Sequence, residues 1–228
     1  MSRKPRGICA YCARERNLTD DHVPPKSWLG HPSPANLVTV PSCYECNRGF
    51  QRNDDYTRTV VALDLSAQQN VAAVSHLPDI FRSLVRPEAA GFRARIMEQM
   101  SATQVVDHTG QPLGRRVSVE RNRIDAAGEH LMRGLHFYEG RQPLSKDSKV
   151  YTFSKPGYHE IDCIVPAFTK ILNQCAAQRV REIGPGFSYV AGANGDVFVW
   201  LMLLYGYFWW VVAVVPSHVE IPGLTQQP

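Results

Sequence analysis

Residues 9–12 read Cys-Ala-Tyr-Cys, residues 43–46 read Cys-Tyr-Glu-Cys, and between them residues 20–25 read Asp-Asp-His-Val-Pro-Pro. Two Cys-x-x-Cys pairs thirty residues apart supply four thiolates in two knuckles, which is the donor set of a closed tetrahedral zinc site. The alternative is a set of unrelated reduced thiols. The spacing predicts a structural Zn²⁺ held by Cys9, Cys12, Cys43 and Cys46.

The first residues of the chain indicate whether these cysteines are in a reducing or an oxidising compartment. The first eight residues, Met-Ser-Arg-Lys-Pro-Arg-Gly-Ile, contain no apolar leader, so we expect a cytoplasmic protein. In that reducing compartment, paired cysteines indicate metal ligands before they indicate disulfides. The other two cysteines, Cys163 and Cys175, lie in apolar settings and are interpreted as ordinary core or surface residues.

Composition and charge narrow the class of protein. The 228 residues are 44% hydrophobic and 20% charged, which excludes a disordered chain and leaves room for two folding units. Residues 1–52 hold eight basic and four acidic side chains, so the whole net charge of +4 falls there. A basic start suits a polyanion such as nucleic acid. Four thiolates on Zn²⁺ would offset about two of these charges, so the indication is mild.

The chain divides into two parts by composition. Residues 1–55 hold too few apolar side chains for an ordinary core, so a metal must supply the missing stability. We expect this module to be followed over residues 56–228 by a mixed α+β domain with an antiparallel sheet. The fold class predicted for the whole chain is therefore α+β.

Helices are expected over about 56–102, interrupted at Pro78 and Pro87. The further elements expected are a hairpin over about 103–119, an amphipathic helix over about 121–139, a strand over 149–154, a helix over about 164–180 and strands over about 186–216.

Residues 197–215 carry no charge over 19 residues, which is long enough for a membrane-spanning helix. β-branched and aromatic residues dominate the run, and neither flank carries a basic anchor. We therefore predict two buried strands that meet near Gly206 rather than a membrane span.

Between the cysteine pairs lie Asp21-His22 and then Asn36-Leu-Val, and the second pair is followed directly by Asn47. In these motifs the chain resembles the HNH endonuclease family, also called His-Me finger or ββα-metal nucleases. The resemblance covers residues 9–54, about a quarter of the chain. It implies a zinc-stapled ββα-metal module and a metal-dependent endonuclease that hydrolyses phosphodiester bonds in DNA.

The resemblance also implies roles for single residues. His22 would be the general base for the attacking water, a task suited to imidazole because it ionises near neutral pH. Asp21 and Asn47 would supply oxygen ligands to a catalytic divalent ion, Mg²⁺ or else Mn²⁺ or Ni²⁺. Asn36 would hold its loop and help to orient His22. Many members carry histidine where this chain has Asn47, which leaves the metal preference open.

Local signals place these residues on structure. Ser42 and Glu45 match a Ser-x-x-Glu capping box, which predicts a helix that begins at Cys43 and carries Asn47 in its first turns. Basic side chains around the motif are candidate contacts to phosphate groups: Lys26, Arg48 and Arg52. The remaining histidines show no comparable motif and are interpreted as structural or surface residues: His31, His76, His108, His130, His136, His159 and His218.

Two other functions stay open. A non-catalytic zinc module that binds nucleic acid or protein would keep the Asp-His pair for structure, and an RNA-directed nuclease would use the same chemistry at phosphorus. One HNH unit cuts one strand, so a double-strand break would need a homodimer. A regulatory protein partner is a further hypothesis. The arrangement resembles bacterial defence, restriction-like and mobile-element nucleases, which is an analogy.

Overall fold

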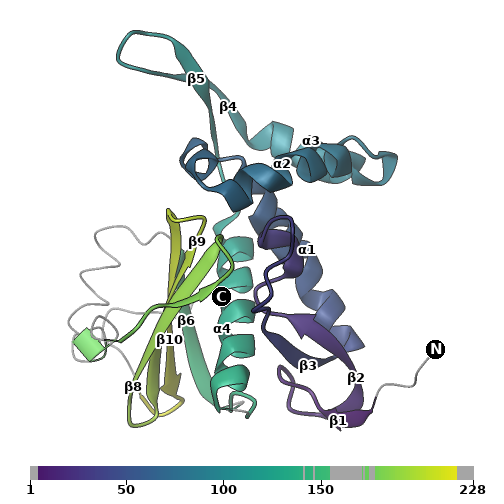
Figure 1. Cartoon of the computed structure of the whole chain (residues 1–228), viewed down its shortest axis with the longest axis vertical. Helices are drawn as coiled ribbons and strands as arrows, with labels where there is room; N and C mark the ends of the chain where they lie inside the picture. Colours follow the sequence, from purple (N-terminus) through teal and green to yellow (C-terminus); the bar gives the residue numbers. More distant parts are fainter. Residues whose placement is uncertain are drawn as a thin grey trace.

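The computed structural model describes residues 5–219 apart from 141, 146, 155–170, 172 and 175–177. In this part of the chain, three antiparallel sheets accompany the helices α1 to α4, so the predicted α+β class is confirmed (Figure 1). Cys163, Cys175 and most of the helix expected over 164–180 lie outside the described residues.

The N-terminal part is a ββα arrangement with one additional short strand. β1 (Arg6–Ile8) pairs with β2 (Glu15–His22), β2 pairs with β3 (Thr39–Cys43), and α1 (Tyr44–Ala62) follows β3 without a loop. The connection from β2 to β3 contains the short 3-10 helix η1 (Lys26–Trp28). Strand pairing therefore fixes the Asp-His pair at the end of β2 beside the strand that leads into α1.

The predicted capping box is not formed. The N-cap of α1 is Cys43 and makes no side-chain capping bond, while Ser42 still belongs to β3. The buried Ser42 hydroxyl instead donates to the Cys43 carbonyl at 3.1 Å, because the residue is held opposite Thr19 of β2. α1 thus starts at Tyr44, one residue later than predicted, and it continues past residue 55.

A helical layer and a hairpin follow α1. They comprise η2 (Leu65–Gln69), α2 (Val71–Leu84), η3 (Pro87–Ala89), α3 (Ala90–Gln99), β4 (Met100–Val106) and β5 (Pro112–Val117). The β4–β5 hairpin projects away from the rest of the chain (Figure 1). The break predicted at Pro78 is wrong, because α2 runs through this exposed residue and water can solvate the carbonyl that lacks a donor. α2 does end before Pro87, as predicted.

α4 (Arg121–Gly140) lies between the ββα part and a five-stranded sheet (Figure 1). In spatial order the sheet comprises β6 (Ser148–Ser154), β10 (Phe208–Pro216), β9 (Val197–Leu204), β8 (Phe187–Asn194) and β7 (Arg181–Ile183). β9 and β10 are joined by a turn in which Gly206 has a φ of 77°. The uncharged run is therefore a β-hairpin, as predicted. Among the described residues, no helix is long and apolar enough to cross a membrane.

α4 contacts both the ββα part and the five-stranded sheet closely, at two of its glycines. An added Cβ at Gly128 would overlap the Trp210 indole, and one at Gly134 would overlap Val23 in the β2–β3 connection. The Trp210 ring also stacks on Trp28 with ring centroids 6.2 Å apart. One apolar core therefore contains buried residues of the ββα part, of α4 and of the sheet.

Candidate functional site

The four cysteines of the two pairs meet where β3 leads into α1. Cys9 and Cys12 belong to the turn between β1 and β2, Cys43 ends β3, and Cys46 lies in the first turn of α1. All four are free thiols, and their sulfur atoms lie within 4.8 Å of one another. The Cys12 and Cys43 sulfurs are 4.0 Å apart.

This cluster can hold a metal ion such as zinc. Four sulfurs at about 2.3 Å from a tetrahedral Zn²⁺ would lie about 3.8 Å apart, which is close to the observed spacing. Burial acts to raise the pKa of the Cys9 thiol, but hydrogen bonds from the backbone of Cys12, Cys43 and Tyr11 outweigh it and lower the pKa to about 7. One of these, from the Cys43 amide to Cys9 Sγ, is 3.3 Å long. Burial raises the pKa of the Cys43 and Cys46 thiols, so a metal ion would have to displace their protons. The predicted four-cysteine cluster is therefore present and can hold a metal ion.

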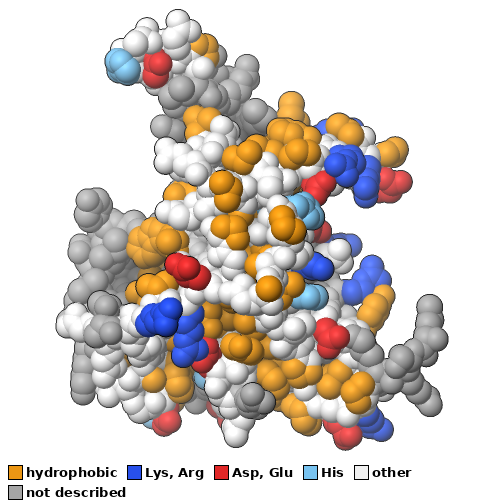
Figure 2. All heavy atoms as spheres, viewed as in Figure 1, with side chains coloured by type: hydrophobic (Ala, Val, Ile, Leu, Met, Phe, Trp, Pro, Cys, Tyr) orange, Lys and Arg blue, Asp and Glu red, His pale blue; other side chains and the backbone are white. Residues whose placement is uncertain are grey.

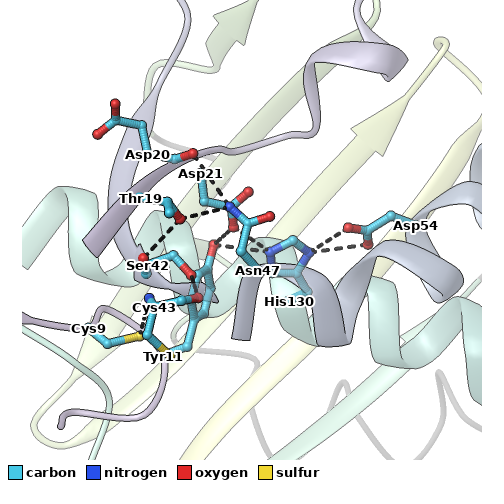
Figure 3. A network of polar contacts seen from close by, with 10 residues as sticks. All are labelled: Cys9, Tyr11, Thr19, Asp20, Asp21, Ser42, Cys43, Asn47, Asp54 and His130. Carbon is cyan, nitrogen blue, oxygen red and sulfur yellow. Dashed lines mark hydrogen bonds and ion pairs between the residues drawn. The ribbon is translucent and has the colours of Figure 1, made fainter. Parts of the chain in front are cut away.

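Asp21 and Asn47 belong to one polar network beside the cysteines (Figure 3). Asn47, on the first turn of α1, donates through Nδ2 to Thr19 Oγ1 at 3.2 Å and to the Asp20 carbonyl at 3.5 Å. The Asp21 side chain is 13% exposed, and its Oδ2 accepts a hydrogen bond from the Tyr11 hydroxyl at 2.6 Å. The helix that carries Asn47 is thus fixed against the strand that carries Asp21.

His22 and Asn36 lie outside this network. His22 is the half-buried last residue of β2, and no described residue makes a hydrogen bond to its imidazole. Asn36 Nδ2 donates to the Glu182 carbonyl at 2.8 Å, and Asn36 Oδ1 accepts from the Gly184 amide at 3.3 Å. The Asn36 side chain therefore ties its loop to the β7–β8 turn. Among the described residues, Asn36 makes no hydrogen bond that would orient His22 as predicted.

The basic candidates are exposed, namely Lys26, Arg48 and Arg52. The Arg48 guanidinium lies over the Tyr44 ring at 5.4 Å from its centroid and donates to the Tyr44 hydroxyl at 2.6 Å. Figure 2 shows Lys and Arg side chains in separate groups on the face that it presents, without a continuous stripe. On this face, the Lys and Arg side chains therefore do not form one continuous basic surface.

A buried histidine that sequence reasoning assigned no function connects directly to Asp21 (Figure 3). His130 of α4 lies with Nε2 at 3.0 Å from Asp21 Oδ2 and Nδ1 at 3.1 Å from both carboxylate oxygens of Asp54. Its Nε2 is also 3.0 Å from the Tyr11 hydroxyl. The imidazole stacks on Phe50 with ring centroids 4.0 Å apart. We call Tyr11, Asp21, Asp54 and His130 the His130 cluster.

The His130 cluster is a charged group in an apolar setting. Burial acts to lower the pKa of His130, but the carboxylates of Asp54 and Asp21 outweigh it and raise the pKa to about 9. Burial raises the pKa of Asp54, although the charge of His130 opposes this effect. Burial and the Asp21 carboxylate raise the pKa of the Tyr11 hydroxyl. At neutral pH, His130 is therefore an imidazolium that donates to a carboxylate on each side.

A sequence signal for this cluster exists, although it is weak. His130 falls on the apolar stripe of the predicted 121–139 helix, one residue before Leu131, and a histidine on a buried helix face needs polar partners. Asp54 lies seven residues after Asn47 and four after Phe50, on the same face of α1. Nothing in the sequence pairs the two faces, because 76 residues separate Asp54 from His130.

A second group of potential metal ligands connects the β2–β3 connection to α2. His31 Nε2 lies 3.0 Å from Asp79 Oδ2, and buried His76 accepts a hydrogen bond from the Gly30 amide through Nε2. Asp79 also pairs with Arg82 at 3.0 Å. These contacts attach the loop to α2, in agreement with the structural role expected for His31 and His76.

No family model, curated protein or solved structure matches the chain. The residues and geometry of the site therefore carry the functional argument.

Proposed function

We propose that this chain is a metal-dependent endonuclease of the HNH type that hydrolyses phosphodiester bonds in DNA. The observation that carries the proposal is the order β2, β3, α1 beside the four-cysteine cluster. This order puts Asp21 and His22 at the end of a strand and Asn47 on the first turn of the next helix.

Asp21 and Asn47 each keep one oxygen available as a ligand. Asp21 is hydrogen-bonded through Oδ2, and Asn47 is hydrogen-bonded through its Nδ2 group, so neither Oδ1 has a hydrogen-bond partner among the described residues. Carboxylate and amide oxygens suit Mg²⁺ or Mn²⁺, which binds few protein ligands and keeps its remaining waters. A divalent ion bound there would polarise the scissile phosphate and stabilise the leaving oxygen.

His22 supplies the base in this proposal. Its imidazole takes the proton of a water molecule whose oxygen attacks phosphorus, and the bond from phosphorus to the sugar oxygen breaks to give a hydroxyl and a phosphate monoester. The absence of a hydrogen bond from any described residue to His22 leaves its ring nitrogen free to accept that proton. The four-cysteine cluster, with a metal such as Zn²⁺, would hold the strand and the helix at a fixed distance.

A non-catalytic binding module is a second candidate, and one observation favours it. Asp21 Oδ2 is occupied by Tyr11 and His130, so the carboxylate already has a structural use. In that case the cysteine cluster and the exposed basic side chains would serve binding of nucleic acid or protein. RNA as substrate is a third outcome, because hydrolysis at phosphorus does not depend on the 2′-hydroxyl.

The test compares purified wild type with His22→Ala on supercoiled plasmid, single-stranded DNA and RNA, each with Mg²⁺, Mn²⁺ or Ni²⁺. We expect the wild type to cut DNA and His22→Ala to be slower by about 10²–10⁴-fold, the usual contribution of a general base. His108→Ala, at an exposed position near the β4–β5 turn, is the control and should cut normally. A wild type that binds DNA but cuts nothing with any ion would favour the binding module.

A further inference from the structure

We propose that His130 is a positioning residue that fixes the metal-binding carboxylate of Asp21, an inference that rests on the proposed nuclease function. His130 belongs to α4, far outside the motif of residues 9–54, and it is 2% exposed. The site would then be completed by a helix of the second part of the chain.

The hydrogen bonds leave one Asp21 oxygen free in a fixed direction. Two donors converge on Oδ2, the Tyr11 hydroxyl at 2.6 Å and His130 Nε2 at 3.0 Å. Oδ1 has no hydrogen-bond partner among the described residues. A carboxylate held at one oxygen by two rigid groups cannot rotate freely, so Oδ1 is presented to an ion without a further loss of side-chain entropy.

Asp54 holds the His130 ring from the side opposite Asp21. Both Asp54 carboxylate oxygens lie 3.1 Å from His130 Nδ1, whereas Nε2 faces Asp21 Oδ2 at 3.0 Å. The ring is therefore held at both of its nitrogens, so Nε2 keeps one direction toward Asp21.

Packing fixes the position of the His130 imidazole. The His130 imidazole and the Phe50 ring stack at 4.0 Å with 12° between their planes, and Phe50 lies one turn after Asn47 on α1. At Gly134, one turn further along α4, an added Cβ would overlap Val23, so α4 lies close against the chain next to His22. The position of α4 therefore sets the position of the Asp21 carboxylate.

The experiment uses the full chain with its cysteine cluster loaded with zinc. Mn²⁺ binding to wild type, His130→Gln and His136→Gln is measured by calorimetry, and kcat and KM for plasmid cleavage are measured on the same samples. His136→Gln is the matched control, because His136 lies on the same helix and packs on Phe198 and Trp200 of the sheet.

We expect His130→Gln to bind Mn²⁺ about 10–100-fold more weakly, the usual effect of removing a partner of a metal ligand. Its kcat should fall while KM for DNA stays within about twofold, and its zinc content should be unchanged. His136→Gln should match wild type. A folded His130→Gln with wild-type Mn²⁺ affinity and kcat would overturn the proposal.

If His130→Gln fails to fold, two other substitutions in the His130 cluster test the proposal. Tyr11→Phe removes one of the two donors to Asp21 Oδ2, and Asp54→Asn alters the group that holds His130 Nδ1 without touching Asp21. Weaker Mn²⁺ binding in either variant supports the proposal, and unchanged binding in both overturns it. The proposal is also overturned if Asp21→Asn binds Mn²⁺ as tightly as wild type does.

Failure of the nuclease function gives a different result. The wild type could cut no substrate and still bind Mn²⁺ more tightly than His130→Gln does. That result would rule out the nuclease function and keep the positioning role of His130. A wild type that cuts normally, together with an unaffected His130→Gln, would remove only the positioning role.

Discussion

The ββα part and the five-stranded sheet are stabilised in different ways. β2 contains no fully buried residue, whereas seven of the nine residues of β10 are buried. Both contribute to one apolar core, but the first also has the four-cysteine cluster, whereas the second depends on apolar surface removed from water alone. The comparison shows that β2 keeps its polar side chains near the surface, beside a cysteine cluster that can hold a metal such as zinc.

Loss of the metal should have the largest effect on stability, and this effect should be confined to the ββα part. Cys43→Ala removes a thiolate, and structural zinc sites contribute about 10 kcal/mol or more of apparent binding free energy. We expect this variant to lose its zinc and to become open to proteolysis across residues 5–62. The β-sheet signal in circular dichroism should largely remain, because the second apolar cluster, on the other face of the sheet, contains no residue of the ββα part.

Proteolysis and metal analysis of Cys43→Ala check this expectation, with wild type treated with a chelator as the parallel sample. Retention of zinc and of wild-type resistance to protease would show that the cysteines are not the main support of the ββα part.

Truncation of the central tryptophan should have the next largest effect. Trp210 is fully buried, stacks on Trp28 and donates through Nε1 to the Ile124 carbonyl at 3.1 Å. We expect Trp210→Ala to cost about 3–5 kcal/mol of unfolding free energy while zinc stays bound. Urea unfolding with zinc analysis measures both. Release of zinc together with the sheet transition would mean that the two regions unfold as one unit.

A smaller effect should appear with pH. Burial acts to lower the pKa of His130, but Asp54 and Asp21 raise it to about 9 in the folded chain. The folded pKa exceeds the unfolded value of about 6.5, so the stabilisation is complete below about pH 6.5 and is lost as pH rises through 9. The difference between the two pKa values corresponds to about 3 kcal/mol of unfolding free energy.

Urea unfolding at pH 6.5, 8 and 9.5 checks this, with His130→Gln as the reference. Wild type should lose stability relative to the variant as pH rises. Parallel curves for the two proteins would show that His130 is not charged in the folded chain.

Local sequence patterns predicted the parts of the site that lie close together in the chain. The four-cysteine cluster follows from the spacing of the two cysteine pairs, the β2–β3–α1 order is what the resemblance over residues 9–54 implies, and the hairpin at Gly206 follows from side-chain type. The capping box failed because Ser42 is used by β3 before α1 begins. A capping-box sequence does not form a cap when strand pairing continues through its serine.

Contacts between distant segments could not be predicted in the same way. His130 meets Asp21 across 109 residues and Asp54 across 76, and the periodicity of each helix gives its buried face but not the partner of that face. Asn36 shows the same limit, because its side chain donates to the carbonyl of Glu182 in β7, 146 residues away. The polar groups were visible in the sequence, but their partners were set by the tertiary packing.

The most direct test of the proposed site compares two neighbouring carboxylates. Asp21 lies in the His130 cluster, whereas the exposed Asp20 side chain points away from that cluster and its carbonyl accepts a hydrogen bond from Asn47 (Figure 3). With zinc retained in both variants, Asp21→Asn should slow Mn²⁺-dependent plasmid cleavage by about 100-fold or more, and Asp20→Asn should cut within a few-fold of wild type. Equal loss in the two variants, or no loss in Asp21→Asn, would contradict a catalytic metal site at Asp21.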